Sequence, residues 1–468
     1  MENLSNQFIQ RSAVAILDAD ARRAIAEGTH TAYRKRQIAM GETSPEHGET
    51  IRQQAAAIKR HALNHLADLL ETAEAQMRAN GINVLWAADA TEARQHVLDI
   101  AGRHGSHKIV KSKSMVTEEI ALNEAMEAAG IETIETDLGE YILQLNQEPP
   151  SHIVTPVIHK SKESIERIFE TKIQMPHTED ATEMARYARL KLRNAFLSAD
   201  MGITGGNFII AETGTLCLVT NEGNGRMVTS LPPVHVAVVG IEKVIATLED
   251  YATLTQVLPR SATGQKMTVY THMINGPRRL GEIDGPEFVY VILVDNGRSG
   301  IYTTDYAEAL ACIRCGACLN ACPVYVVAGG HSYGWVYSGP IGAVVTPLLT
   351  GLENAKPLPY ASSLCGSCKQ VCPVDIDIPR MLLDLRHDLV ETGLTERVWD
   401  YGMQAWAFGT RSPGLYQLGG KAAAFATNSL PLKGLPGPLA GWTNYRTPPK
   451  FAMKPFRALW AERDKQDE

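Results

Sequence analysis

Cysteines carry the clearest chemistry in this sequence, because seven of its eight cysteines fall in two short stretches at the spacing of metal ligands. The first stretch reads Cys-x2-Cys-x2-Cys-x3-Cys-Pro, with its cysteines at Cys312, Cys315, Cys318 and Cys322. Thiolates spaced in this way bind one iron–sulfur cluster, and the last of the four reaches a neighbouring cluster. The spacing predicts metal ligands rather than disulfides.

The second stretch repeats the first at an offset of fifty residues, and Ser362 stands where its leading cysteine would fall. Its cysteines are Cys365, Cys368 and Cys372. If the repeats cross over as they do in two-cluster ferredoxins, each cluster takes a ligand from the other repeat. The first set is then Cys312, Cys315, Cys318 and Cys372, and the second set is Cys322, Cys365 and Cys368.

The second set lacks one thiolate, which leaves three outcomes open. The Ser362 oxygen could bind the fourth iron, a solvent or partner ligand could do so, or the corner could be empty in a three-iron cluster. Zinc held by four thiolates suits isolated Cys-x2-Cys pairs but not this repeated pattern. Two adjacent clusters predict a one-electron relay rather than a bond-making site, tuned by hydrogen bonds, burial and the odd ligand.

The elements that must position these ligands belong to a chain of ordinary globular composition, with 468 residues of which 44% are hydrophobic and 21% charged. This length suits two or three domains. Residues 11–80 show apolar positions at helical spacing, and Gly81 ends the last predicted helix. Short β-rich runs alternate with helical patterns in the first half of the rest, which predicts an α/β domain with a mainly parallel sheet. These runs span 84–88, 107–111, 131–136, 208–212, 215–220, 234–239, 267–272 and 288–294.

Two polar turns follow strands of this predicted domain. In residues 111–114, Ser114 could cap the next helix, as could Thr117, and the segment 221–226 contains two glycines and an arginine. Either turn could hold an anion, but turn chemistry and capping are the favoured interpretation. Glu212 is favoured as a solvated strand-end carboxylate. Cys217, His235 and His272 are expected to be core or rim residues.

Several classes of function find no support in the sequence. No dinucleotide, P-loop, serine-hydrolase or zinc-protease motif occurs, so a self-contained hydride-transferring dehydrogenase is hard to support. The formal net charge of -7 gives no basic footprint for nucleic acid. No leader pattern and no apolar run of membrane-spanning length is present, which predicts a cytoplasmic protein.

The segments around and after the cysteines are also informative. Residues 328–347, rich in glycine and aromatic residues, either cover the clusters or meet an electron partner. The run after Pro373 predicts an amphipathic helix. Residues 409–447 are rich in glycine and proline, and a basic-aromatic piece at 451–460 follows. Packing on the chain's own domain is favoured for this arm over partner binding.

Several segments together resemble the lactate utilization protein B family. They are the run GITGGNFIIAETGTLCLVTNEGNGRMVTSLPPVHVAVVGIEKV at 202–244, ETDLGEYILQL at 135–145, the two cysteine motifs and GWTNYR in the tail. The resemblance implies an N-terminal LUD domain, related in fold to the NagB/RpiA/CoA-transferase group, followed by an α-helical ferredoxin-type domain with two [4Fe-4S] clusters. It implies four parts: N-terminal helices at 1–70, a LUD α/β domain at 71–298, the dicluster domain at 299–395 and a C-terminal region at 396–468.

Members of that family resemble an electron-transfer subunit of a three-protein system that oxidises L-lactate to pyruvate. The resemblance implies as partners a cysteine-rich iron–sulfur protein and a second LUD-domain protein. It gives the same two ligand sets as the spacing does, with three cysteines for the second cluster, and it identifies no catalytic residue or lactate site. The alternative is an enzyme in its own right that acts on a carboxylate or thioester in the LUD cleft, with the clusters as an attached relay.

Overall fold

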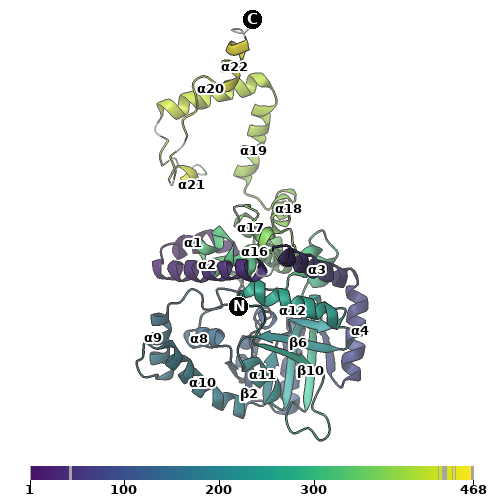
Figure 1. The fold of residues 1–468 in the computed structure, drawn as a ribbon. Coiled ribbons are helices and arrows are strands. Elements are labelled where there is room, and N and C mark those ends of the chain that lie inside the picture. The colour runs from purple at the N-terminus through teal and green to yellow at the C-terminus, as the bar shows by residue number, and fades with distance from the viewer. Residues whose placement is uncertain are drawn as a thin grey trace. The chain divides into compact units, whose positions relative to one another are not determined.

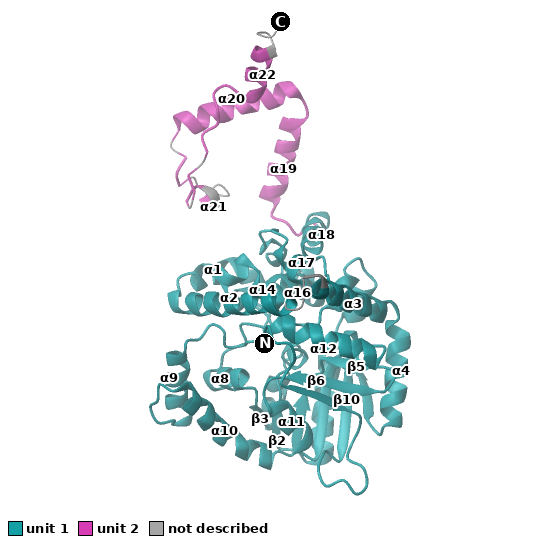
Figure 2. Cartoon of the chain, in the orientation of Figure 1, with its two compact units in different colours: residues 1–392 teal, residues 393–468 magenta. Residues whose placement is uncertain are grey.

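The computed structural model describes residues 2–41, 45–430, 432–434, 440–444, 446–447 and 449–464. The chain divides into two compact units, residues 1–392 and 393–468, which are coloured separately in Figure 2. Among the described residues, no helix combines the length and apolar character that crossing a bilayer requires.

Unit 1 begins with helices, as the sequence predicts: α1 (Phe8–Ala15), α2 (Ala19–Gly41), α3 (Pro45–Asn64) and α4 (Leu66–Ala79) (Figure 1). Gly81 follows α4 with φ near +87°, and its N–H donates to the Arg78 carbonyl. A glycine adopts this left-handed conformation without the steric cost of a Cβ. The predicted stop signal at Gly81 is therefore confirmed.

The main sheet has six strands in the order β1-β10-β7-β4-β2-β3, and every neighbouring pair is parallel. The strands are β1 (Asn83–Ala87), β2 (Lys108–Lys111), β3 (Glu132–Glu135), β4 (Met201–Thr204), β7 (Val234–Gly240) and β10 (Phe288–Val294). All seven residues of β7 are buried, as expected for a parallel strand covered on both faces. The prediction of an α/β domain with a mainly parallel sheet is confirmed.

Alternation along β7 shows how the two faces of this sheet are covered. Val236 and Val238 point to one side, where they share a hydrophobic core with α5 (Ala90–His104), α6 (Met115–Glu119) and α7 (Leu122–Ala128). Ala237 and Val239 share the opposite core with α4 and a second sheet. That second sheet runs β8-β5-β6-β9. Its strands are β5 (Phe208–Ile210), β6 (Thr215–Thr220), β8 (Val244–Ile245) and β9 (Tyr270–Ile274).

Further helices complete the α/β part of unit 1. A separate core beside Val110 of β2 joins α8 (Leu138–Asn146), α9 (Lys162–Ile173), α10 (Ala181–Ser198) and α11 (Asn224–Ser230). Helix α12 (Leu248–Ala262) begins with a capping box, in which the Thr247 hydroxyl accepts the Asp250 N–H and the Asp250 carboxylate accepts the Thr247 N–H. Such a reciprocal pair satisfies two donors that the first turn would leave free.

The cysteine region continues the same compact unit. Its helices are short: α13 (Arg298–Tyr302), α14 (Ala317–Asn320), α15 (Pro323–Ala328), α16 (Gly339–Thr350), α17 (Ser367–Val371) and α18 (Ile378–Glu391). The buried face of α18 carries Met381, Leu382, Leu385 and Leu389, which confirms the predicted amphipathic helix after Pro373. Tyr333 and Tyr337, in the segment between the repeats, are almost fully buried, so these aromatic side chains pack in the core.

Three details differ from the sequence-based expectation. Strand β4 (MGIT) and the two-residue β8 were not predicted, and β9 begins at Tyr270 rather than at 267. Unit 2, for which the sequence predicted no particular secondary structure, contains α19 (Arg397–Thr410) and α20 (Pro413–Ser429), followed by the shorter α21 (Ala440–Thr443) and α22 (Phe456–Asp464). Pro413 occupies the first turn of α20, where a missing N–H costs nothing.

Candidate metal centre

The first predicted ligand set comes together in the structure. Its four cysteines line one small cavity, together with apolar side chains such as Ile313, Ile341 and Ile376. The fourth cysteine, Cys372, arrives from the second repeat, as the crossover pattern requires. Three of the four are buried, and Cys312 is half-buried. The lining is thiols and hydrocarbon, which is the donor set that an iron–sulfur cluster takes.

Tight backbone turns hold this set. Arg314 has φ near +60° and Gly316 near +73°, so the chain curls between Cys312 and α14. The Arg314 N–H donates to Cys312 Sγ at 3.4 Å, and the Ile376 N–H donates to Cys372 Sγ at 3.4 Å. Backbone donors of this kind stabilise negative charge on sulfur and tune a bound cluster. A side chain at Gly316 would collide with His152, since a Cβ there would lie 2.9 Å from the imidazole Cε1.

The second predicted set lies where α15 and α17 begin. Cys322 is the N-cap of α15, and the Tyr325 N–H donates to its Sγ at 3.5 Å. Burial raises the pKa of Cys368 to about 11, and the negative charges of Cys322 and Cys365 contribute to that rise. Cys365 itself is exposed, and its Sγ donates to Ser367 Oγ at 3.5 Å. Hydrogen bonding with the Ser367 side chain lowers the pKa of Cys365.

Ser362 is engaged in its own turn. Its Oγ accepts the Leu364 N–H at 3.1 Å, and Leu364 has φ near +54°. Such a short-range bond is typical of a serine that shapes a turn. The role of Ser362 as a fourth ligand stays a prediction.

The separation of the sulfur atoms distinguishes between the metals. Four thiolates on one tetrahedral zinc, each at about 2.3 Å from the metal, would lie about 3.8 Å apart. All eight cysteines are among the described residues, and no three of their Sγ atoms lie within 4.8 Å of one another. Sulfurs that bind separate irons of a cluster stand further apart than sulfurs on one ion. The described cysteines therefore form no preformed tetrahedral zinc site.

The two N-terminal helices α2 and α3 clamp the loop that carries Cys372. Arg36 Nη2 donates to the Val371 carbonyl at 2.8 Å, and Arg52 Nε donates to the Cys372 carbonyl at 2.8 Å. Arg52 also pairs with Asp375 at 2.6 Å. These guanidinium groups bring positive charge to the first ligand set, where a thiolate-bound cluster would be negative. Sequence reasoning missed both arginines, because no local pattern distinguishes them from other helix cations.

A buried ionic network joins the α/β part to the cysteine region. Arg298 donates from both terminal nitrogens to the Glu119 carboxylate, at 2.8 and 2.9 Å, and from Nε to Glu242 at 2.6 Å. The Tyr337 hydroxyl donates to Glu119 at 2.6 Å. Burial alone would raise the pKa of Glu242, but Arg298, Lys243 and Arg314 hold it below its usual range. The network fixes the loop that leads from β7 against the segment between the repeats.

A larger cleft of about 400 Å³ adjoins the first ligand set, and Ile153, Ile313 and Arg314 line both spaces. Parts of both polar turns singled out in the sequence lie on its wall, namely 112–114 of the turn at 111–114, and Asn221, Glu222 and Asn224 of the turn at 221–226, whose Arg226 does not line the cleft. Ser114 caps α6 by accepting the Thr117 N–H at 3.3 Å, as predicted. The sequence did not show that the two turns meet.

The remaining candidates have structural roles. Glu212 Oε1 accepts the Leu248 N–H at the start of α12. Burial raises the pKa of Cys217 to about 12, which makes it an inert core thiol. His235 is fully buried and bonds to the Thr204 hydroxyl at 2.9 Å. His272 lies half-buried on β9. The expectations for Cys217 and His235 as core residues are confirmed.

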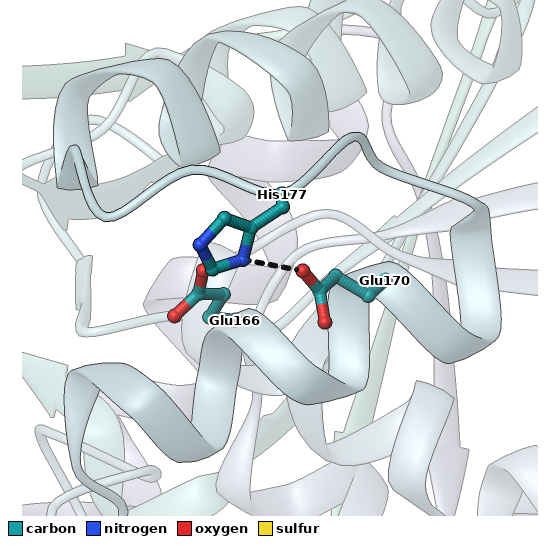
Figure 3. Close-up of side chains that lie close together, drawn as sticks. All are labelled: Glu166, Glu170 and His177. Carbon is teal, nitrogen blue, oxygen red and sulfur yellow. Dashed lines mark hydrogen bonds and ion pairs between the residues drawn. The ribbon is translucent and has the colours of Figure 1, made fainter.

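One group outside the cysteines has the geometry of a cation site. Figure 3 shows Glu166 and Glu170 on α9 facing His177, whose Nδ1 lies 2.8 and 2.9 Å from their carboxylates. The hydrogen bond that His177 donates to Glu170, with the negative charge of Glu166, raises the pKa of His177. A protonated imidazole bridging two carboxylates accounts for the arrangement without a metal.

Three family models match successive parts of the chain. Residues 70–294 match the LUD domain family, residues 308–376 match the 4Fe-4S dicluster domain, and residues 390–465 match the C-terminal region of lactate utilisation protein B. The chain is 44% identical to lactate utilization protein B of Shouchella clausii over 98% of this chain and 97% of that protein. It is 46% identical to the same-named protein of Bacillus licheniformis over 89% of each. An Escherichia coli protein described as an uncharacterized electron transport protein, YkgF, is 41% identical over 99% of this chain and 98% of that one.

Proposed function

The chain belongs to the lactate utilization protein B family, and from that premise we propose that it is the iron–sulfur electron-transfer subunit of a multi-protein system that oxidises L-lactate to pyruvate. The observation that carries the proposal is the cavity lined by four cysteines from two repeats. The match to a dicluster domain over the same residues supports it.

We assign two [4Fe-4S] clusters. The first uses Cys312, Cys315, Cys318 and Cys372, and the second uses Cys322, Cys365 and Cys368 with a fourth ligand that is not a cysteine of this chain. Cys318 and Cys372 are separated by 53 intervening residues (372 − 318 − 1), yet they line one space. Such a meeting of distant thiols in an apolar wall supports a shared cluster.

Bound clusters would supply one-electron transfer. The residues of this chain hold them, surround the first set with apolar side chains, and direct backbone N–H groups at Cys312, Cys322 and Cys372. Burial raises the pKa of Cys315 and Cys372 to about 12, so these thiols hold their protons until iron displaces them. Exposed Cys365 places the second set where a partner protein can approach.

The proposed partners are the other subunits of lactate oxidation, a cysteine-rich iron–sulfur protein and a second LUD-domain protein. We keep the four-part division at 1–70, 71–298, 299–395 and 396–468 as part of the proposal. The N-terminal helices pack on the cysteine region in unit 1, so they serve as a clamp for the clusters rather than as a separate body. The cytoplasmic location stays a prediction.

Reduction of a dye by L-lactate tests the proposal. The anaerobically reconstituted chain alone should not pass electrons from L-lactate to the dye, and addition of the two partner proteins should start the reaction. A Cys372→Ala variant should fail in the reconstituted system while Cys217→Ala works. Lactate-driven dye reduction by this chain alone would instead establish it as an enzyme in its own right.

A further inference from the structure

The 400 Å³ cleft lies at the point of the main sheet where ligands bind in open α/β folds. After β2 the chain returns to the main sheet at β3 on one side, whereas after β4 it passes through β5, β6 and α11 and returns to the main sheet at β7 on the other side. The chain therefore leaves the carboxyl ends of β2 and β4 in opposite directions. Residues 112–114 and 205–207, which follow these strands, line the cleft. This crevice is a topological switch point.

Three cations line the cleft: Lys113, Lys243 and Arg314. The buried Nζ of Lys113 and the buried Nη1 of Arg314 have no hydrogen-bond partner among the described residues. Lys243 is better satisfied, since its Nζ donates to the Cys312 carbonyl at 3.4 Å and lies 3.6 Å from Glu242. A buried ammonium or guanidinium nitrogen without a partner costs stability, so each of the first two is a donor that a ligand could satisfy.

Most carboxylates in and beside the cleft already take part in hydrogen bonds or ion pairs. Asp137 caps α8 by accepting the Gly139 and Glu140 N–H groups. Glu222 accepts the Leu138 N–H at 3.2 Å, and burial raises its pKa to about 7. Glu242 pairs with Arg298. Glu140 is close enough to feel the charge of Lys113, yet burial still raises the pKa of Glu140 to about 8. The second oxygen of Glu242 lies 3.6 Å from Lys243 and 4.0 Å from Arg314. Lys113 is therefore the lining cation that forms no ion pair or hydrogen bond among the described residues.

The rest of the wall determines the kind of ligand. Apolar side chains such as Ile153, Leu218 and Leu258 line it beside the amides of Asn207 and Asn224. A volume of about 400 Å³ lies in the range of organic-ligand sites and exceeds what an isolated inorganic anion would fill. An organic body with an anionic group fits both the apolar wall and the unpaired donors.

We propose that this cleft is a binding site for an organic anion, whose carboxylate or phosphate is met by the free donors of Lys113 and Arg314 and whose body packs on the apolar wall. Because Arg314, Ile153 and Ile313 also line the space of the first ligand set, the anion lies one side-chain layer from that set. The ligand could exchange electrons with the first cluster only if the proposed function is correct. The binding site itself does not depend on it.

Calorimetric titration of the anaerobic full-length holoprotein tests the site. The probes are L-lactate and pyruvate as short carboxylates, and AMP and FMN as phosphates on a ring body, so that the two sources of negative charge are separated. We expect saturable binding of at least one probe. Lys113→Met should weaken that binding by about tenfold or more, because a charge-assisted hydrogen bond is lost.

Two further variants make the result specific. Ala262→Leu narrows the cleft without changing its charge and should also weaken binding. Lys191→Met removes an exposed lysine of α10 that does not line the cleft and should leave binding unchanged. The melting temperature of Lys113→Met should equal or exceed that of the parent, because an unpaired buried ammonium is removed.

Failure of all four probes to saturate, or binding that Lys113→Met leaves intact, would overturn the proposal. The electron paramagnetic resonance signals of the clusters, recorded on the same samples, separate this failure from failure of the proposed function. Intact signals without probe binding would refute the site alone.

Discussion

Replacing Arg298 with methionine should destabilise unit 1 strongly, because it leaves two buried carboxylates without their cation. Arg298, Glu119 and Glu242 all have side-chain exposures of 0–1%. Removing one partner of such a group costs about 3–5 kcal/mol. With an unfolding entropy of about 2.1 cal/mol/K per residue, the free energy of unfolding of a unit of 392 residues falls by about 0.8 kcal/mol per kelvin near its melting temperature. A loss of about 4 kcal/mol then lowers the melting temperature by about 5 °C.

The pH dependence gives the sharper test. In the parent, Arg298 holds the pKa of both carboxylates below its usual range against burial, so they stabilise the fold above the unfolded carboxyl pKa. In Arg298→Met, Glu119 loses its only cation, so burial raises the folded pKa of Glu119, whereas Lys243 and Arg314 still oppose the effect of burial on Glu242. The difference in melting temperature between Arg298→Met and the parent should therefore shrink as the pH falls from about 8 to about 5, because protonation removes the uncompensated negative charge of the buried carboxylate.

Differential scanning calorimetry of anaerobic protein measures both quantities. Arg186→Met is the matched control, since Arg186 forms an exposed pair with Glu183 and its loss should cost under about 1 kcal/mol. The reasoning is refuted if Arg298→Met melts like the control, or if its deficit is the same at both pH values.

Three other substitutions test the ligand sets and their support. Cys372→Ala should abolish the signal of the first cluster, although this residue lies in the second repeat, while Cys217→Ala should leave the iron content unchanged; equal iron loss in both would contradict the crossover. Ser362→Cys should convert the second cluster to four-thiolate ligation and lower its reduction potential, as potentiometry would show; an unchanged potential would mean that this position does not face the cluster. Arg52→Met should release the loop around Cys372 and hasten oxygen-driven loss of the first cluster, followed by its visible absorbance, whereas unaltered decay would remove Arg52 from the clamp.

The sequence was informative wherever a local pattern determines the structure. The Cys-x2-Cys-x2-Cys-x3-Cys-Pro spacing predicted ligand sets from residues alone, and the structure brings Cys372 into the cavity of the first set. The apolar runs of β7 and β10 were long enough to identify buried parallel strands. Helix α4 and its stop at Gly81 followed from apolar periodicity and one glycine.

What the sequence left out depends on contacts between distant segments. Strand β4 has only four residues, including Gly202, whose missing side chain lets the Val228 carbonyl come within 2.0 Å of where a Cβ would stand. Without β4, the switch point between β2 and β4 could not be located, and the two polar turns remained separate. Arg36 and Arg52 look like ordinary helix cations until α2 and α3 are placed against the cysteine loop.

In the tail, composition was a poor guide to secondary structure. Its glycines and prolines led to no helix prediction, yet α20 forms because Pro413 lies in the first turn and the run at 422–424 is alanine, the best helix former. Many of its large apolar side chains, Trp406 and Phe425 among them, are exposed in unit 2. Composition alone did not distinguish this helical segment from a disordered one.

The central claim is that seven cysteines of this chain hold two iron–sulfur clusters, and metal analysis combined with electron paramagnetic resonance of anaerobic protein tests it most directly. We predict about eight irons with matching labile sulfide per chain, or about seven irons if the second cluster holds three, and signals from two interacting centres on reduction. Stoichiometric zinc in place of iron, or protein that binds neither iron nor sulfide after reconstitution, would contradict the account.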